Sequence, residues 1–215
     1  MVGKRYLYVG LLLIGLCLQG CSIPVEVKAT EEINFSIDID RLLAASKINK
    51  AKLFPNNKIP PEYKLTLPFW YNTNYDLSQN EDIKKYKSKI RNLRVKQISY
   101  KVTENSLSVY LPSYKQVLEV FLAEKDKSST DDFTKIGHFL PIPAGKFNIT
   151  ERLLLDDGGE ETASGYFKDL AFAIGLKGAI ILDGSQDPTP PSGRISLRIV
   201  VEVALTVDVD LSEGP

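Results

Sequence analysis

The stretch RISLRIVVEVALTVDVDL, residues 194–211, decides the fold prediction. Every odd position in it is apolar, from Ile195 to Leu211, while most even positions carry polar or charged side chains. Side chains of an extended strand point alternately to opposite faces, so this period of two predicts a strand with one buried face. The strand would be longer than usual, so we expect a bend or a β-bulge in the pairing along it.

A second alternating segment, residues 170–182, precedes it and has its apolar residues on even positions. An antiparallel pairing that sets Leu182 beside Ile195 makes the two apolar faces coincide. The intervening DGSQDPTPPSG is rich in turn-forming residues. We therefore predict a long C-terminal hairpin, with its irregularity at Gly175 and Gly178.

Residues 162–174 leave one alternative open. Tyr166, Leu170 and Ile174 share one face at the period of a helix as well as fitting the strand in part. We favour the strand.

Shorter alternating segments predict further strands at residues 32–40, 63–71, 95–102, 107–111 and 117–123. Pro68 favours an edge position or a β-bulge for the second of these. Val102 set opposite Leu107 makes a self-consistent hairpin from the third and fourth. Residues 78–93 predict a helix, capped by Ser78 with Glu81 at the capping-box position. The fold prediction is all-β: one antiparallel β-sandwich domain over residues 32–215 with one or two short helices.

The composition limits the function classes. The hydrophobic fraction of 43% and charged fraction of 25% are those of an ordinary globular domain. Lys and Arg together number 27, as do Asp and Glu, so no overall charge attracts the chain to nucleic acid. We expect no nucleic-acid partner.

The N-terminus reads as an export signal. Lys4 and Arg5 precede the mostly apolar segment 6–20, which is short for a membrane-spanning helix. The sequence Leu-Gln-Gly-Cys ending at Cys21 resembles the lipobox of bacterial prolipoproteins, although Gln19 departs from the preferred small residue. The resemblance covers residues 1–21.

That resemblance implies a signal peptide over residues 1–20 and a mature N-terminus at Cys21, which would carry diacylglycerol and further fatty acyl chains. Residues 21–31 would then be the lipidated cysteine and a tether. Ser22 resembles the residue that follows the cysteine in lipoproteins sorted to the outer membrane. The expected location is the cell envelope, on the outer membrane facing the periplasm or on the cell surface, or on the plasma membrane of an organism with a single membrane. Cys17 would be removed, which leaves a folded domain without a thiol.

Catalytic patterns are sparse. The single histidine, His138, lies beside two apolar residues and has no nucleophile motif near it in sequence, so we expect no enzyme, although a hydrolase stays a distant alternative. We expect no cofactor apart from the lipid. Asp183, Ser185 and Asp187 have the spacing that begins a calcium loop, but the later positions of that pattern are missing, so we regard them only as weak calcium candidates.

Two segments are weak binding candidates. Trp70, Tyr71 and Tyr75 lie in FWYNTNY, and if Trp70 and Tyr75 face outward they suit a sugar or a pocket in a partner. The second segment is the basic run that contains Lys84, Lys85 and Lys87, which beside a lipid anchor suits anionic headgroups.

The resulting hypothesis is a membrane-anchored lipoprotein that acts by binding, as an adaptor or scaffold for another envelope protein. The alternatives are a carrier of a lipid or other apolar ligand, and a subunit of an oligomeric pore to which residues 195–211 contribute membrane strands.

Overall fold

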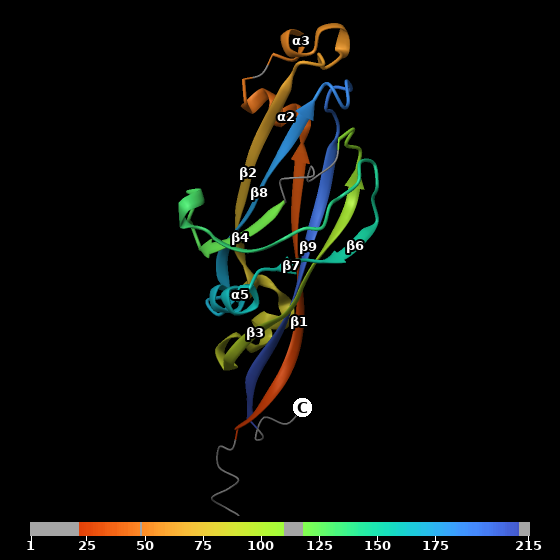
Figure 1. The fold of residues 1–215 in the computed structure, drawn as a ribbon. Coiled ribbons are helices and arrows are strands. Elements are labelled where there is room, and N and C mark those ends of the chain that lie inside the picture. Colours follow the sequence, from red (N-terminus) through yellow and green to blue (C-terminus); the bar gives the residue numbers. More distant parts are fainter. Residues whose placement is uncertain (1–21, 48, 110–117, 211–215) are drawn as a thin grey trace, which may run out of the picture.

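The structure is a computed structural model, and it describes residues 22–47, 49–109 and 118–210. These residues form two antiparallel sheets packed face to face, as predicted for a β-sandwich (Figure 1). The four-stranded sheet has the order β1 (Ser22–Asp38), β9 (Arg194–Asp210), β3 (Ile90–Asn105), β6 (Ile149–Arg152). The five-stranded sheet has the order β2 (Lys64–Asp76), β8 (Ala171–Asp183), β4 (Glu119–Glu124), β5 (Thr134–His138), β7 (Leu154–Leu155).

Short helices connect or cover the strands. The α-helices are α2 (Ile39–Ala45), α3 (Lys50–Leu53), α4 (Glu81–Tyr86) and α5 (Gly159–Phe167). Four 3-10 turns accompany them: η1 (Pro55–Asn57), η2 (Leu77–Gln79), η3 (Lys87–Lys89) and η4 (Thr130–Asp132). No helix among the described residues is both long enough and apolar enough to span a membrane.

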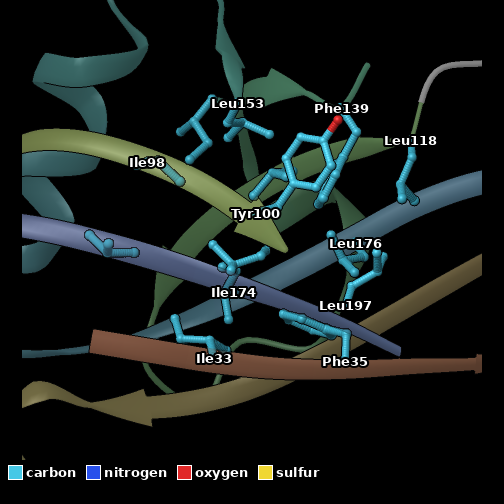
Figure 2. Close-up of a cluster of buried hydrophobic side chains, with 14 of the residues drawn as sticks. Ile33, Phe35, Ile98, Tyr100, Leu118, Phe139, Leu153, Ile174, Leu176 and Leu197 are labelled. Atoms are coloured by element: carbon cyan, nitrogen blue, oxygen red, sulfur yellow. The ribbon is translucent and has the colours of Figure 1, made fainter. Parts of the chain in front are cut away.

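Strand β9 is the centre of the four-stranded sheet, and the prediction of a strand with one buried face is confirmed. Its odd positions from Ile195 to Val207 are at most 1% exposed. They pack in one core with side chains of both sheets and with the tilted ring pair Tyr100 and Phe139, whose ring centroids lie 4.4 Å apart (Figure 2). At about 25 cal/mol per Å² of buried apolar surface, this strand is a major source of the stability of the fold.

The predicted C-terminal hairpin is wrong. β9 pairs with β1 along its whole length and with β3, whereas β8 lies in the other sheet between β2 and β4. Residues 184–193 therefore cross from one sheet to the other. The apolar faces of β8 and β9 can be buried together in two ways: the strands can be neighbours in one sheet, or they can face each other across the sandwich. The alternation in the sequence is the same in both arrangements, so it could not distinguish them.

The alternative for residues 162–174 resolves as a helix followed by a strand. Helix α5 ends at Phe167, Leu170 adopts a left-handed backbone conformation with φ of 59°, and β8 begins at Ala171. Phe167 packs on Phe172 of β8 at 4.3 Å between ring centroids. The preference for a strand across this whole segment was wrong.

The expected irregularity is present, but on a different strand. The pairing of β3 with β9 shifts register three times, whereas that of β8 shows no shift against β2 or β4. Gly175 and Gly178 serve packing instead: a β-carbon at either would overlap the ring of Trp70 or Phe69, respectively.

Three further predictions need correction. Residues 107–109 form no strand, and Val102 pairs with Leu197 and Ile149 rather than with Leu107; Leu111 lies outside the described residues. The helix expected over residues 78–93 is only α4, and Asn80 rather than Ser78 caps it by accepting from the backbone N–H groups of Asp82 and Ile83. After η3 the apolar pattern changes to that of a strand, which ends the helix.

The segment expected to be a tether is part of a strand. Residues 22–31 form the first part of β1 and pair with β9 from Asp210 to Val201. Ala29 is buried and Val27 is half-buried against the core, because the alternation that predicted a strand from residue 32 begins earlier, at Ile23. Cys21 itself lies outside the described residues.

Gly175 provides a test of the packing of β8. Replacing Gly175 with alanine is expected to lower the free energy of unfolding by about 1–3 kcal/mol, because the new methyl group must displace the indole of Trp70. The matched control is Gly165→Ala in α5, where no atom lies within 4 Å of the added carbon. That substitution is expected to leave stability unchanged or raise it by about 0.5–1 kcal/mol. Denaturant unfolding measures both, and equal effects would contradict this account of Gly175.

Candidate functional site

A cleft of about 440 Å³ lies on the side of the sandwich where the edges of the two sheets meet. The end of β1, helix α2, the middle of β2 and the start of β9 enclose it. Its lining residues are Ser36, Asp38, Arg41, Leu42, Ala45, Ser46, Pro68, Phe69, Trp70, Tyr71 and Arg194.

Two edge strands flank this cleft. β1 is the edge of the four-stranded sheet and β2 is the edge of the five-stranded sheet, so each has one side that no strand of the described residues pairs. The predicted edge position of the strand with Pro68 is confirmed, since proline has no N–H to donate to a neighbouring strand. Further along, Asn80 donates to the carbonyl of Thr30 at 3.0 Å, which bridges the two sheets and closes this side of the sandwich below the cleft.

Helix α2 closes the other end of the cleft. Its sequence begins with Asp38, whose carboxylate accepts from the backbone N–H of Arg41 at 3.0 Å and caps the helix. Leu42 and Leu43 anchor the helix in the core, and this anchoring leaves the Arg41 side chain exposed at the cleft. Helix α2 is therefore a fixed part of the site.

The charges of the cleft are unevenly compensated. The Nε of Arg194 donates to Glu104 at 2.9 Å, and this bond raises the pKa of Arg194. The guanidinium of Arg41 forms no salt bridge within the described residues. Burial raises the pKa of the Tyr71 hydroxyl, and Asp38 raises that pKa further while Arg41 opposes it. The site therefore combines an arginine without a salt bridge in the described residues, the carboxylate of Asp38, and a neutral, half-buried phenol.

The three aromatic candidates, Trp70, Tyr71 and Tyr75, do not lie in one common site. Tyr71 and Trp70 both line the cleft. The Trp70 ring packs edge-on against Phe121 and Phe133, at 5.6 and 4.9 Å between centroids, on the outer face of its sheet. The indole N–H of Trp70 is buried without a hydrogen-bond partner in the described part of the chain.

Tyr75 does not face outward as expected. It lies four positions after Tyr71 in one continuous strand and therefore on the same face, so it points into the sandwich and packs beside Phe172 at 6.0 Å between centroids. Its hydroxyl donates to the carboxylate of Glu31 and lies 3.1 Å from the carbonyl of Glu32. Burial and these neighbours raise the pKa of Tyr75. Tyr75 ties the two edge strands together and is no ligand-facing residue.

The basic candidates lie elsewhere. Lys84 and Lys85 are in α4 and Lys87 is in η3, all exposed. Lys84 lies 3.8 Å from Glu81, and the Nζ of Lys85 lies 5.2 Å from the centroid of the Tyr86 ring. None of the three lines the cleft.

The calcium candidates Asp183, Ser185 and Asp187 form hydrogen bonds within their own loop. Asp183 accepts from the backbone N–H of Ser185 at 3.1 Å and from the hydroxyl of Ser185, and it lies 3.0 Å from the Nζ of Lys64. Those contacts lower the pKa of Asp183, the Ser185 hydroxyl most and the Lys64 ammonium next. Asp187 accepts from the backbone N–H of Thr189 at 2.8 Å. Within residues 22–47, 49–109 and 118–210, no three histidine, cysteine or acidic side chains gather as a metal site would need.

His138 belongs to a small ionic cluster at the end of β5. Its Nδ1 lies 3.4 Å from Asp156, while Lys135 lies 3.3 Å from the same carboxylate and 3.0 Å from Glu119. Burial acts to lower the pKa of Lys135, but the bonds to Glu119 and Asp156 outweigh it and raise that pKa. Asp156 is therefore engaged by a permanent cation, so its proximity to His138 is accounted for by a structural ion-pair network.

Sequence reasoning missed the charged residues of the cleft. Asp38, Arg41 and Arg194 come from segments far apart in the chain and form no motif. The only available signal was the position of Asp38 and Arg41 at the end of the strand predicted at residues 32–40.

Together, the fold and the cleft define an all-β, two-sheet antiparallel sandwich with a charged cleft between its edge strands. No protein-family model and no curated protein sequence matches the chain. Among solved structures it is similar to one of desmodium yellow mottle tymovirus, with 13% identity, 89% of this chain and 93% of that chain covered, and a TM-score of 0.31. It is also similar to one of turnip yellow mosaic virus, with 8% identity, 70% and 96% covered, and a TM-score of 0.27. At these TM-scores the likenesses carry no argument about function.

Proposed function

We propose that this chain is a lipid-anchored, non-catalytic binding module of a bacterial cell envelope, and that it binds an extended segment of another envelope protein in the cleft between β1 and β2. The anchor is the acylated Cys21 that the lipobox-like sequence implies. The outer membrane is the proposed location, on the basis of Ser22.

The observation that carries the binding role is the position of the cleft between two unpaired strand edges. An extended peptide can add its backbone hydrogen bonds to such an edge, while nearby pockets select its side chains. Arginine and tyrosine are enriched at protein interfaces, and the cleft holds Arg41, Arg194 and Tyr71. The guanidinium of Arg41, which forms no salt bridge within the described residues, favours a segment that carries a carboxylate.

The two alternatives have less support. A carrier needs an enclosed, mainly apolar cavity, whereas this cleft is lined by three charged side chains. A pore formed by β9 would have to expose the apolar face that is buried between the two sheets. We therefore propose neither.

Site-specific crosslinking tests the proposal. A photoreactive residue at Ser36 or Ala45, both exposed in the cleft, is expected to capture one envelope protein in living cells. The same residue at Thr150, exposed on β6 at the opposite edge of its sheet, is the positional control.

Arg41→Glu is expected to reduce that capture about tenfold, the equivalent of ~1.4 kcal/mol. The substitution places an acid in the first turn of α2, which suits the helix dipole and leaves the fold intact. The matched control is Arg152→Glu on β6, which is expected to have no effect. Equal capture from Thr150, or insensitivity to Arg41→Glu, would rule out the cleft as the binding site.

A further inference from the structure

The end of the sandwich opposite the cleft has an apolar surface. Ile23 and Val25 are 48% and 40% exposed, and they pair with Val209 and Val207 of β9. Their side chains lie on the face of β1 that is buried elsewhere by the second sheet. Here the paired ends of β1 and β9 project at one end of the sandwich (Figure 1), and Ile23 and Val25 stay exposed although Val207 is buried.

The basic segment formed by α4 and η3 runs toward this same end. At the start of the helix, its cap Asn80 bonds to Thr30 of β1. At the end of η3 the chain enters β3 at Ile90, which lies opposite Val207, and Val207 lies opposite Val25. The segment therefore runs from the level of Thr30 to the level of Val25.

This direction separates the charges of the segment. The two acids of α4, Glu81 and Asp82, occupy its first turn, and Lys84 lies 3.8 Å from Glu81. Lys84, Lys85 and Lys87 follow toward the apolar end and are all exposed. The neighbouring cations pair with acids at this same end: Arg91 with Asp208, and Arg94 and Lys96 with Glu26, the residue after Val25. Three lysines thus flank exposed apolar residues at one end of the molecule.

We infer that this end, defined by Ile23, Val25, Lys84, Lys85 and Lys87, rests on an anionic phospholipid surface. The inference rests on the proposed lipid anchor, because Cys21 immediately precedes β1 and holds this end at the bilayer. Apolar side chains then enter the headgroup boundary while the lysines meet anionic headgroups.

The same geometry sets the direction of the cleft. From Ile23 to Asp38, β1 is one uninterrupted strand paired with β9. At about 3.3 Å per residue it extends roughly 50 Å. The sandwich therefore presents the cleft away from its own membrane, toward proteins that do not share that surface.

Fluorescence quenching tests the inference on the full-length lipidated protein in vesicles. An environment-sensitive dye is attached through Val25→Cys, or through Ser46→Cys at the cleft as control. The vesicles contain either half phosphatidylglycerol and half phosphatidylcholine, or phosphatidylcholine alone, with a nitroxide-labelled lipid as quencher. Strong quenching is expected at position 25 in the anionic vesicles and little at position 46.

Charge reversal tests the role of the lysines. The triple substitution Lys84→Glu, Lys85→Glu, Lys87→Glu is expected to reduce quenching at position 25 in anionic vesicles at least threefold. The matched control reverses Lys47, Lys52 and Lys58, which lie in and around α3 at the opposite end (Figure 1). An equal effect of the two triple variants would overturn the inference.

The remaining outcomes separate this inference from the anchor. If the protein stays on vesicles through a high-salt wash but position 25 is not quenched, the inference fails and the anchor stands. If the protein washes off and Cys21 reacts with the dye, the anchor fails and this inference fails with it. Protection of the dye by self-association in detergent, without vesicles, would identify a second copy as the occupant and would also overturn it.

Discussion

Replacing Val201 with asparagine is expected to lower the free energy of unfolding by about 3–5 kcal/mol. Val201 is 1% exposed in the middle of β9, between Ile98 of β3 and Glu31 of β1. The substitution loses the burial of a valine, worth roughly 1.5–3 kcal/mol, and buries an amide without partners, which costs about 1–3 kcal/mol more. Domains of this kind are stable by only about 5–15 kcal/mol, so the variant is expected to be largely unfolded at moderate denaturant.

The adjacent Val200 is a matched control. It has the same side chain on the same strand but points to the outer face, where it is half-buried between Glu32 and Ser99. Val200→Asn is expected to change stability by less than about 1 kcal/mol. Urea unfolding followed by circular dichroism measures both variants. Similar losses at the two positions would contradict the assignment of the odd positions to the core.

The period-two pattern was sufficient to predict the strands and their buried faces. It predicted that Ile195 and its odd-numbered successors are interior, and the whole of β9 follows this rule to Val207. The pattern did not predict which strands pair with each other. β8 and β9 have matching apolar faces, but they belong to different sheets and face each other across the core. Alternation reports which side of a strand is buried, while the choice of neighbour depends on all strands at once.

Element boundaries failed where two local preferences competed. The lysine-rich run after Ser78 suits a helix, yet β9 requires a partner strand from Ile90 onward, and tertiary pairing overrode the helical preference. The same competition extends β1 back to Ser22. Residues 22–31 resemble a polar tether when taken alone, but they pair with β9 and so become part of the strand. In both cases the local sequence was ambiguous, and pairing with the long strand β9 decided the structure of the segment.

The candidate site was only partly accessible from sequence. Trp70 and Tyr71 were identified as binding candidates, and both line the cleft. Arg41 and Arg194 were not identified, because they are separated by most of the chain and meet only when β9 pairs with β1 and so lies beside α2. The function prediction for Lys84, Lys85 and Lys87 stays a prediction, but the fold adds their position beside the exposed Ile23 and Val25.

Cys21→Ser is expected to abolish the incorporation of fatty acid into the protein completely. In the proposed maturation the thiol of Cys21 is the atom that receives the diacylglycerol, and a serine hydroxyl is far less nucleophilic than a thiolate. The leader is then expected to remain on the chain, since cleavage before Cys21 is what the resemblance to prolipoproteins implies.

Metabolic labelling with palmitate and the intact mass of the product measure this prediction, and Cys17→Ser is its matched control. Cys17 lies four residues earlier in the same apolar segment, so its loss is expected to leave both labelling and cleavage unchanged. Membrane release is the wrong readout, because an uncleaved apolar leader can hold the chain at the bilayer without any acyl chain. Labelling that survives Cys21→Ser, or that disappears with Cys17→Ser, would rule out Cys21 as the attachment point and with it the orientation inferred for the exposed end of β1.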